Sequence, residues 1–350
     1  MKSKDVLVSV VMGVYNGEKY IREAVQSVLD QTYGNFEFII VNDASTDGTV
    51  AILEKFKDER IRILHNKENK RLAYSLNKGI KEAKGKYILR MDADDICMPD
   101  RFANQIAFME KNPRVGVSFG RCMSFSERKI LNLLDTNEAS AEYIAANMIF
   151  FNTVYHPSVI IRSEIFKTME YNEQYTVSED VELWLRVTKE YEIVRTKDLT
   201  LLYRVHSNQV STKYTTIQIN QECKMKRPYL EEIVGDLLED EDVVFYKIAR
   251  RREVVSKEEL FFWLNKLSIG NMENKIYNAA VFEQVLLRVG MVVAYYNRYL
   301  FAFLWKGIGA FGLAAMIKIT LRMTKNIIEE SIFRLKTLPK AKEVLQKYER

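Results

Sequence analysis

The first half of the chain alternates β-branched, apolar runs with amphipathic stretches of helical length, and this alternation constrains the fold more than any other feature. The segments expected are strands at residues 7–14, 36–41, 61–64 and 87–91, with helices between them at 20–29, 49–56 and 72–83. This order is typical of a parallel sheet covered by helices. Ligands bind at the carboxyl ends of the strands in such sheets, so the polar residues that follow each strand are candidate site residues.

The pattern continues to about residue 205 and then changes. The further elements expected are helices at 99–111 and 180–189 and strands at 115–119, 158–162 and 199–205. Beyond residue 213 the strand-like runs stop, and helix-like segments with charged connectors follow. We therefore predict an α/β catalytic domain over residues 1–212 and an α-helical C-terminal region over 213–350, which either associates with a membrane or forms a dimer.

Composition narrows the classes of function. Of the 350 residues, 47% are hydrophobic, which is enough for a large core and excludes overall disorder. The 52 basic and 47 acidic residues nearly balance, so there is no nucleic-acid-binding signature. The cysteines Cys97, Cys122 and Cys223 lack metal-ligand spacing and indicate reduced thiols on the cytosolic side. The basic and then apolar start has no small-residue cleavage site, so we expect no export signal.

The segment 41–49 follows the second predicted strand and is rich in Asn, Asp, Ser and Thr. These residues also cap helices, so a turn with a helix cap is one interpretation. The other is a binding loop in which Asp43, the acid nearest the end of the strand, accepts hydrogen bonds from the base or ribose of a nucleotide.

Three carboxylates, Asp92, Asp94 and Asp95, stand within four positions directly after strand 87–91. Their mutual repulsion requires exposure to solvent or a compensating cation. A solvated loop is one interpretation, and a divalent cation with oxygen ligands is the other. Side chains alternate along a strand, so Asp92 and Asp94 would face the same way, which suits one ribose contact and one metal contact.

The third cluster, Ser178 to Asp180, opens a predicted helix. One interpretation is a serine N-cap with acids in the first turn, which the helix dipole stabilises. In the other, one of the two acids is a general base that takes the proton of an acceptor hydroxyl.

The three histidines receive different interpretations. His65 ends a predicted strand and is interpreted as a structural or a loop residue. His156 precedes a proline that favours extended backbone, and both an acceptor-facing and a structural role fit it. His206, with Arg204 nearby, either meets a diphosphate, completes a metal shell or belongs to a polar loop.

Taken in order, these segments resemble the family 2 inverting glycosyltransferases, which share the GT-A nucleotide-sugar-binding fold. The resemblance is carried by residues 12–17, 42–49, 91–95, 156–158, 179–180 and 203–206. It covers roughly the first 210 residues, and the joint order of the segments is more specific than any one of them.

The resemblance implies transfer of a sugar from a nucleotide diphosphate, by family expectation UDP, to a hydroxyl of a saccharide or lipid-linked acceptor in bacterial surface polysaccharide synthesis. The implied donor-binding residues are Gly13, Val14, Tyr15, Asn16, Asp43, Arg71, Asn77, Asp92 and Ala93. Among these, Tyr15 and Asp43 would hold the base and Asp92 the ribose. The implied ligands of Mn²⁺ or Mg²⁺ are Asp94 and His206, and the implied catalytic base is Asp180. Glu179 and His156 would lie on the acceptor side.

Two positions depart from the family pattern. The family usually has proline where Gly13 stands, which loosens the turn that presents Tyr15 and Asn16. It usually has glycine where Arg71 stands, so a bulky cation alters the loop that approaches the nucleotide. Both departures leave the identity of the donor open.

A sugar nucleotidyltransferase and a non-catalytic scaffold are the two alternative functions. A sugar nucleotidyltransferase would need a glycine-rich basic loop after the first strand, whereas this loop contains Glu18. A degenerate domain that serves as a non-catalytic scaffold is disfavoured, because Asp43, Asp92, Asp94 and Asp180 are all retained.

The tail contains an apolar stretch, residues 299–317, which Lys306 and three glycines interrupt. Its flanking basic and aromatic residues favour a position in the headgroup region of the inner leaflet over a simple spanning helix. Peripheral attachment to the cytoplasmic membrane would bring the site to a lipid-linked acceptor. The alternative is a buried helical hairpin that packs on the catalytic domain or on a second subunit of a homodimer.

Overall fold

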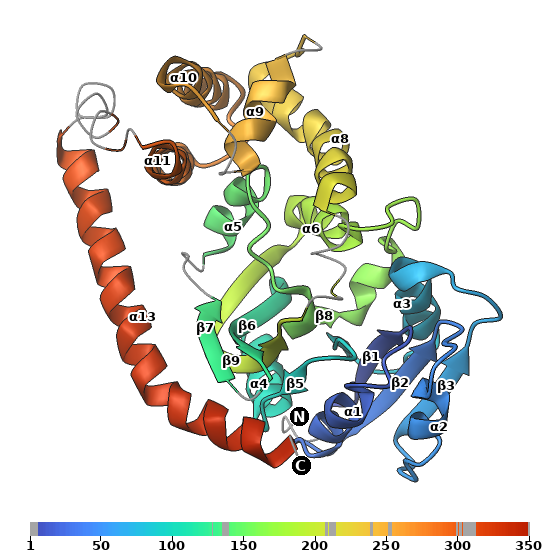
Figure 1. Ribbon diagram of the computed structural model, residues 1–350. Coiled ribbons are helices and arrows are strands. Elements are labelled where there is room, and N and C mark those ends of the chain that lie inside the picture. The colour runs from blue at the N-terminus through green and yellow to red at the C-terminus, as the bar shows by residue number, and fades with distance from the viewer. Residues whose placement is uncertain are drawn as a thin grey trace. The chain divides into compact units, whose positions relative to one another are not determined.

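The computed structural model describes residues 6–127, 129–134, 140–206, 209, 215–238, 241–250, 254–298, 300, 303 and 313–348. The chain divides into two compact units (Figure 1). The sheet unit comprises Met1–Asp135, Val154–Thr215 and Ile332–Arg350, and the helical unit comprises Thr136–Thr153 and Thr216–Ser331. The predicted domains, 1–212 and 213–350, meet outside the described residues and stay a prediction.

The sheet unit is built on a mixed sheet with nine strands among the described residues. These are β1 (Val8–Val14), β2 (Phe36–Asn42), β3 (Ile61–His65), β4 (Tyr87–Arg90), β5 (Ile96–Cys97), β6 (Val115–Ser126), β7 (Lys129–Leu134), β8 (Val159–Arg162) and β9 (Glu192–Arg204). Their order is β3-β2-β1-β4-β8-β6-β9-β5, with β7 paired to β6. The strands β3, β2, β1 and β4 are mutually parallel, while β8 is antiparallel to both of its neighbours.

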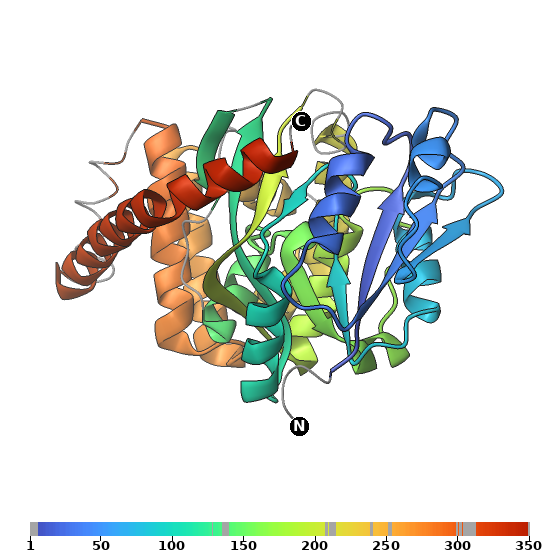
Figure 2. The same ribbon diagram turned by 90° about the horizontal axis from the view of Figure 1, so that it is seen from below.

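Helices cover both faces of the parallel part of the sheet (Figures 1 and 2). The helices of the sheet unit are α1 (Ile21–Leu29), α2 (Thr49–Leu53), α3 (Arg71–Lys81), α4 (Arg101–Lys111) and α6 (Glu179–Glu190), with 3-10 turns at His156–Ser158 and Ser163–Lys167. Alternate residues of β1, such as Val8 and Val10, share one core with α1 and α4. Val11 faces α3, where Gly79 permits close approach, because an added Cβ would lie 2.7 Å from Cγ1 of Val11.

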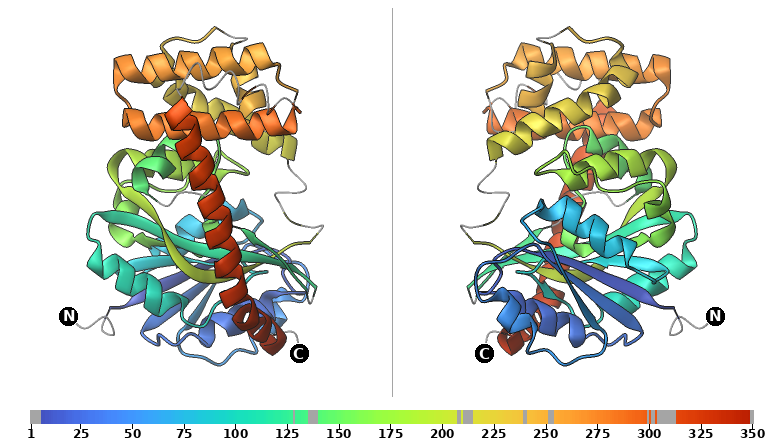
Figure 3. Two further views of the ribbon diagram at one scale, coloured as in Figure 1. Left: turned by 90° about the vertical axis from the view of Figure 1, so that its left-hand side faces the viewer. Right: turned by 90° about the vertical axis from the view of Figure 1, so that its right-hand side faces the viewer.

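The helical unit has its own core. Its helices are α5 (Ala141–Met148), α8 (Thr215–Val234), α9 (Glu241–Arg250), α10 (Lys257–Asn274) and α11 (Ala279–Tyr296). The aromatic side chains of Phe245, Trp263 and Phe282 pack at its centre. The long helix α13 (Leu313–Tyr348) begins in this unit and ends in the sheet unit (Figure 3).

One described helix, α11, is long and apolar enough to cross a membrane by length and composition, with a mean hydropathy of 1.3. Half of that segment is buried, and Val285 and Val289 belong to the core of the helical unit. This burial is typical of a core helix. The apolar stretch predicted at residues 299–317 lies largely outside the described residues.

The predicted α/β fold and the change to helices after residue 213 are confirmed for the part of the chain that the structure describes. The sequence reading missed β5, β7 and α5. β5 has only two residues, too few to display an alternating pattern. The expectation of a mostly parallel sheet holds for β1 to β4 and for β6 with β9, whereas β5, β7 and β8 pair antiparallel.

Candidate active site

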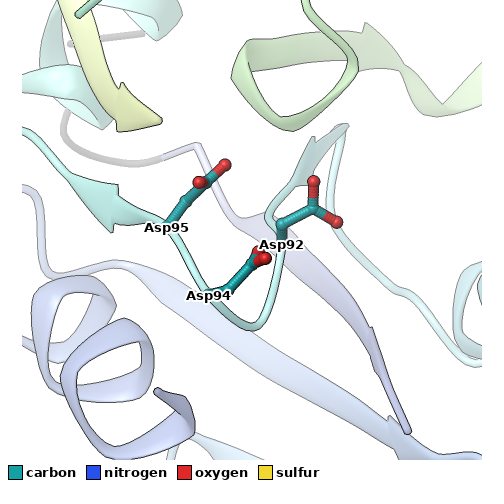
Figure 4. A group of neighbouring side chains, drawn as sticks. All are labelled: Asp92, Asp94 and Asp95. Carbon is teal, nitrogen blue, oxygen red and sulfur yellow. The ribbon is translucent and has the colours of Figure 1, made fainter. Parts of the chain in front are cut away.

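The acidic turn between β4 and β5 brings three carboxylates together (Figure 4). Oxygens of Asp92, Asp94 and Asp95 lie within 4.8 Å of one another. Burial raises the pKa of Asp95 well above its usual range, and the charges of Asp94 and Asp92 raise it further. Its Oδ2 is buried and has no hydrogen-bond partner among the described residues. A buried carboxylate left this way fits a divalent cation, which prefers oxygen ligands.

Arg90, the last residue of β4, is a buried cation next to this turn. Its Nη2 forms an ion pair with Oδ1 of Asp92 at 2.5 Å. Burial raises the pKa of Asp92 despite this ion pair, and the charge of Asp94 adds to the rise. The Nε and Nη1 atoms of Arg90 have no hydrogen-bond partner within the described part of the chain. Arg90 therefore anchors Asp92 from inside the protein.

The end of β9 meets the acidic turn. Nε2 of His206 lies 2.9 Å from Oδ2 of Asp94, so the two predicted metal ligands are in contact. Arg204 donates from Nε to the backbone oxygen of Asp94 at 2.6 Å, and its backbone N–H donates to Oδ1 of Asp95 at 2.8 Å. Glu23 pairs with the guanidinium of Arg204. These contacts fix the backbone of the turn against β9.

The loops that follow β1 and β2 hydrogen-bond to each other. The backbone N–H of Asn16 donates to Oγ of Ser45 at 2.9 Å, and the N–H of Thr46 donates to Oδ1 of Asn16 at 2.8 Å. Tyr15, which directly follows β1 in the first of these loops, is 50% exposed. An exposed aromatic ring in such a place can stack on a planar base.

Asp43 is buried, and it organises the loop before α3. Its Oδ1 accepts hydrogen bonds from Nδ2 of Asn66 at 2.7 Å and from the N–H of Lys70 at 2.9 Å. Its Oδ2 accepts one from the N–H of Arg71 at 2.8 Å. Arg71 has a φ of 71°, in the left-handed region that favours glycine. Glycine adopts such a φ without steric cost, which is the physical reason why the family usually has glycine at this position.

Asn77 and His156 are joined through Tyr171. Nδ2 of Asn77 donates to the carbonyl of Tyr171 at 2.8 Å, and the N–H of Tyr171 donates back to Oδ1 at 3.0 Å. The hydroxyl of Tyr171 lies 2.7 Å from Nε2 of His156. Burial, aided by the nearby charge of Arg90, lowers the pKa of His156 well below its usual range, so its ring is neutral at pH 7. Both predicted site residues thus lie in a buried polar network.

Glu179 and Asp180 begin α6, after Ser178 with a φ of 66°. Burial raises the pKa of Glu179 to about 8, and the charge of Asp180 adds to the rise. Glu179 therefore holds its proton in most molecules at pH 7. A carboxyl group that keeps its proton can donate a hydrogen bond, which favours a role for Glu179 other than that of general base.

The remaining predicted donor residues lie in or beside β1 and the acidic turn. Gly13 and Val14 end β1, and Ala93 lies between Asp92 and Asp94. At Gly13, an added Cβ would lie 2.9 Å from Cδ1 of Leu72, so Leu72 fills the space where the family usually has proline.

Sequence reasoning left two residues out of the site. Arg90 could have been found, because a charged residue inside an otherwise apolar strand is unusual. Tyr171 lies in an irregular segment and carried no signal in the sequence.

Comparison with known proteins identifies the family. The family model described as Glycosyl transferase family 2 matches residues 9–168. An uncharacterised glycosyltransferase of Haemophilus influenzae is 30% identical over 300 residues, which are 79% of this chain and 93% of the relative. The chain belongs to glycosyltransferase family 2. This glycosyltransferase is also similar to WfaP of Escherichia coli, named UDP-Glc:alpha-D-GlcNAc-diphosphoundecaprenol beta-1,3-glucosyltransferase, with 32% identity over 63% of this chain and 86% of WfaP.

Solved structures confirm the GT-A fold of this glycosyltransferase. S. aureus TarS in complex with UDP superposes with a TM-score of 0.55 at 19% identity, over 85% of this chain and 88% of that chain. A mannosyltransferase from Pyrobaculum calidifontis, in complex with GDP-Man and Mn²⁺, has a TM-score of 0.50 at 17% identity, over 97% of this chain and 85% of that one. At these identities the likeness concerns the fold alone.

Proposed function

We propose that this family 2 glycosyltransferase transfers a sugar from a UDP-sugar to an acceptor hydroxyl with inversion at the anomeric carbon. The observation that carries the proposal is the contact between the acidic turn and the end of β9, where Asp94 meets His206. Beside them, Oδ2 of Asp95 has no hydrogen-bond partner in the part of the chain that the structure describes. The base and ribose would lie along the ends of β1 and β2, near Tyr15, Asp43 and Asp92. A UDP donor is supported by the name of WfaP and by the UDP complex of TarS.

A divalent cation, Mn²⁺ or Mg²⁺, fits this site. Asp94 and His206 would hold it, with oxygens of Asp92 and Asp95 in reach. The cation would supply positive charge for the diphosphate that leaves. The Mn²⁺ complex of the Pyrobaculum mannosyltransferase supports this assignment by analogy.

The base in this proposal is Asp180. The acceptor oxygen attacks the anomeric carbon and gives its proton to Asp180, while the nucleotide diphosphate leaves on the opposite face. No enzyme nucleophile intervenes, so the configuration inverts. Glu179 is mostly protonated at pH 7 and would donate a hydrogen bond to the acceptor rather than take its proton. Neutral His156 would help to shape the acceptor side through Tyr171.

A panel of nucleotide sugars, each with Mn²⁺ or Mg²⁺, tests the proposal. Release of nucleotide diphosphate is measured with and without acceptor saccharides. We expect release from one UDP-sugar, stimulated by metal and lost when EDTA is added. Release that is equal in EDTA would overturn the metal assignment, and no release from any donor would favour the non-catalytic scaffold.

We further propose a lipid-linked saccharide as the acceptor, in the synthesis of a bacterial surface polysaccharide at the inner face of the cytoplasmic membrane. The name of WfaP, with its diphosphoundecaprenol acceptor, supports this class. Flotation of the full chain with anionic liposomes tests the location. Failure to float, alongside a preference for water-soluble acceptors, would contradict it.

A further inference from the structure

The end of α13, residues 332–348, packs on the sheet unit and is called here the C-terminal clasp (Figures 1 and 3). Nζ of Lys347 lies 2.6 Å from Oδ2 of Asp30, at the end of α1, and the hydroxyl of Tyr348 donates to the same oxygen at 2.9 Å. Nζ of Lys340 lies 2.6 Å from Oδ2 of Asp100, at the start of α4. Polar contacts thus hold the clasp at two helix ends.

One face of the clasp is apolar and buried. Its buried residues recur at helical spacing: Ala341, Val344, Leu345 and Tyr348. They form one core cluster with residues of β5, β6 and β9 and the residue after β5, among them Ile96, Met98, Phe125 and Leu202. The clasp therefore packs against the strands that lead into and out of the donor site.

Those strands position the acidic turn. Ile96 follows Asp95 directly and pairs with Leu202, two residues before Arg204. The N–H of Met98 donates to the carbonyl of Thr200 at 3.0 Å, which extends the pairing by one residue.

The same cluster supports the guanidinium of Arg204. The ring of Phe125 lies 4.5 Å from that guanidinium. Arg204 in turn bonds to Asp94 and Asp95. Packing by the clasp thus reaches the acidic turn through β5 and through Phe125.

β5 has only two residues and, among the strands that the structure describes, pairs with β9 alone. A ladder this short has few hydrogen bonds of its own, so its order depends on side-chain packing. We propose that the C-terminal clasp is a positioning element of the donor site, which holds the acidic turn against Arg204 and His206. The identity of the ligand rests on the proposed function. The effect of the clasp on the order of β5 and β9 does not depend on that function.

The acceptor side has separate support. Asn77 of α3 holds Tyr171, which contacts His156, through hydrogen bonds that involve no residue of the clasp. Loosening the clasp should therefore raise the KM for the donor and the metal concentration needed for half-maximal activity. The accompanying fall in kcat should be smaller.

The test compares two neighbouring substitutions. Leu345→Ala removes a buried side chain of the clasp, and Gln346→Ala, at an exposed position of the same helix turn, is the matched control. Tyr348→Phe is a milder variant that keeps the ring and loses only the hydroxyl bond to Asp30. All three are made in the full chain.

The first readout is amide hydrogen exchange in the metal-free protein. We expect the amides of Met98 and Arg204 to exchange at least ~10-fold faster in Leu345→Ala, with a smaller change in Tyr348→Phe and none in Gln346→Ala. The amides of β1 are the internal reference. Equal acceleration at β1, or unchanged exchange at Met98 and Arg204 in both clasp variants, would overturn the proposal.

The second readout is calorimetric titration with UDP in the presence of Mn²⁺. We expect at least ~10-fold weaker binding to Leu345→Ala than to Gln346→Ala. Failure of the unsubstituted protein to bind UDP would count against the proposed donor, while the exchange experiment would still decide the role of the clasp.

Discussion

Nε2 of His206 lies 2.9 Å from Oδ2 of Asp94, although 112 positions separate the two residues in the chain. The contact forms because β5 and β9 pair antiparallel. This pairing brings Asp94, shortly before β5, next to His206, shortly after β9. Two side chains of this kind can share a metal ion or a hydrogen bond. The arrangement makes the roles of both residues testable.

Asp94→Ala should abolish metal-dependent donor binding, because it removes a carboxylate from the acidic turn and the partner of His206. Calorimetric titration of UDP with Mn²⁺ and with EDTA measures the effect. Asp198→Ala, at an exposed position of β9, is the control. An unchanged gain in affinity with Mn²⁺ would contradict the assignment.

Asp180→Asn should lower turnover by at least ~100-fold while donor affinity stays near normal, because the amide keeps the shape of the side chain but cannot take a proton. Initial rates at saturating donor, together with UDP titrations, check both parts. If the variant keeps a near-normal rate, Asp180 is not the base and Glu179→Gln is examined for that role.

Glu179 should make stability depend on pH. Its pKa is about 8 in the folded protein and 4.5 ordinarily, so between these values the folded state keeps a proton that the unfolded state has released. The stabilising contribution is therefore complete below pH 4.5 and is lost as pH rises through 8. Urea unfolding at pH 6, 7.5 and 9 should show the free energy of unfolding of the wild type falling relative to Glu179→Gln.

Glu164→Gln, at an exposed position of the sheet unit, is the control for this titration. It should follow the wild type at every pH. Wild type and Glu179→Gln curves that stay parallel from pH 6 to 9 would show that Glu179 titrates normally.

Arg71→Gly should raise the free energy of unfolding by up to ~1 kcal/mol, because relief of the left-handed backbone, about 1–2 kcal/mol, exceeds the roughly 0.4–1 kcal/mol lost to the added freedom of the unfolded chain. Arg71 has a φ of 71°, and its side chain is exposed. Lys70→Gly is the control, because Lys70 has a φ of −105°, which any residue adopts without strain. This substitution should lower the free energy of unfolding, since glycine only adds freedom to the unfolded chain. Equal destabilisation by both substitutions, measured in urea, would refute this account.

The sequence by itself determined the fold and the family, because the order of apolar runs indicates the fold and short local segments indicate the family. Alternation of apolar runs with amphipathic helices predicted β1 to β4 and the helices between them, which the structure confirms. The acidic turn was predicted at the end of β4 because three carboxylates within four positions after an apolar strand repel one another and need solvent or a cation. The joint order of six short segments predicted family 2, which the comparisons confirm.

Tertiary structure alone decided how those segments meet. The short ladder of β5 with β9 brings His206 to Asp94, and a two-residue strand leaves no periodic trace in the sequence. Burial, which depends on all packed neighbours, separates the pKa of Glu179 from its ordinary value. The contact of the clasp with the sheet could not be predicted from the sequence either. Leu345 and Ile96 are distant in the chain, and only the folded structure shows that they share one core.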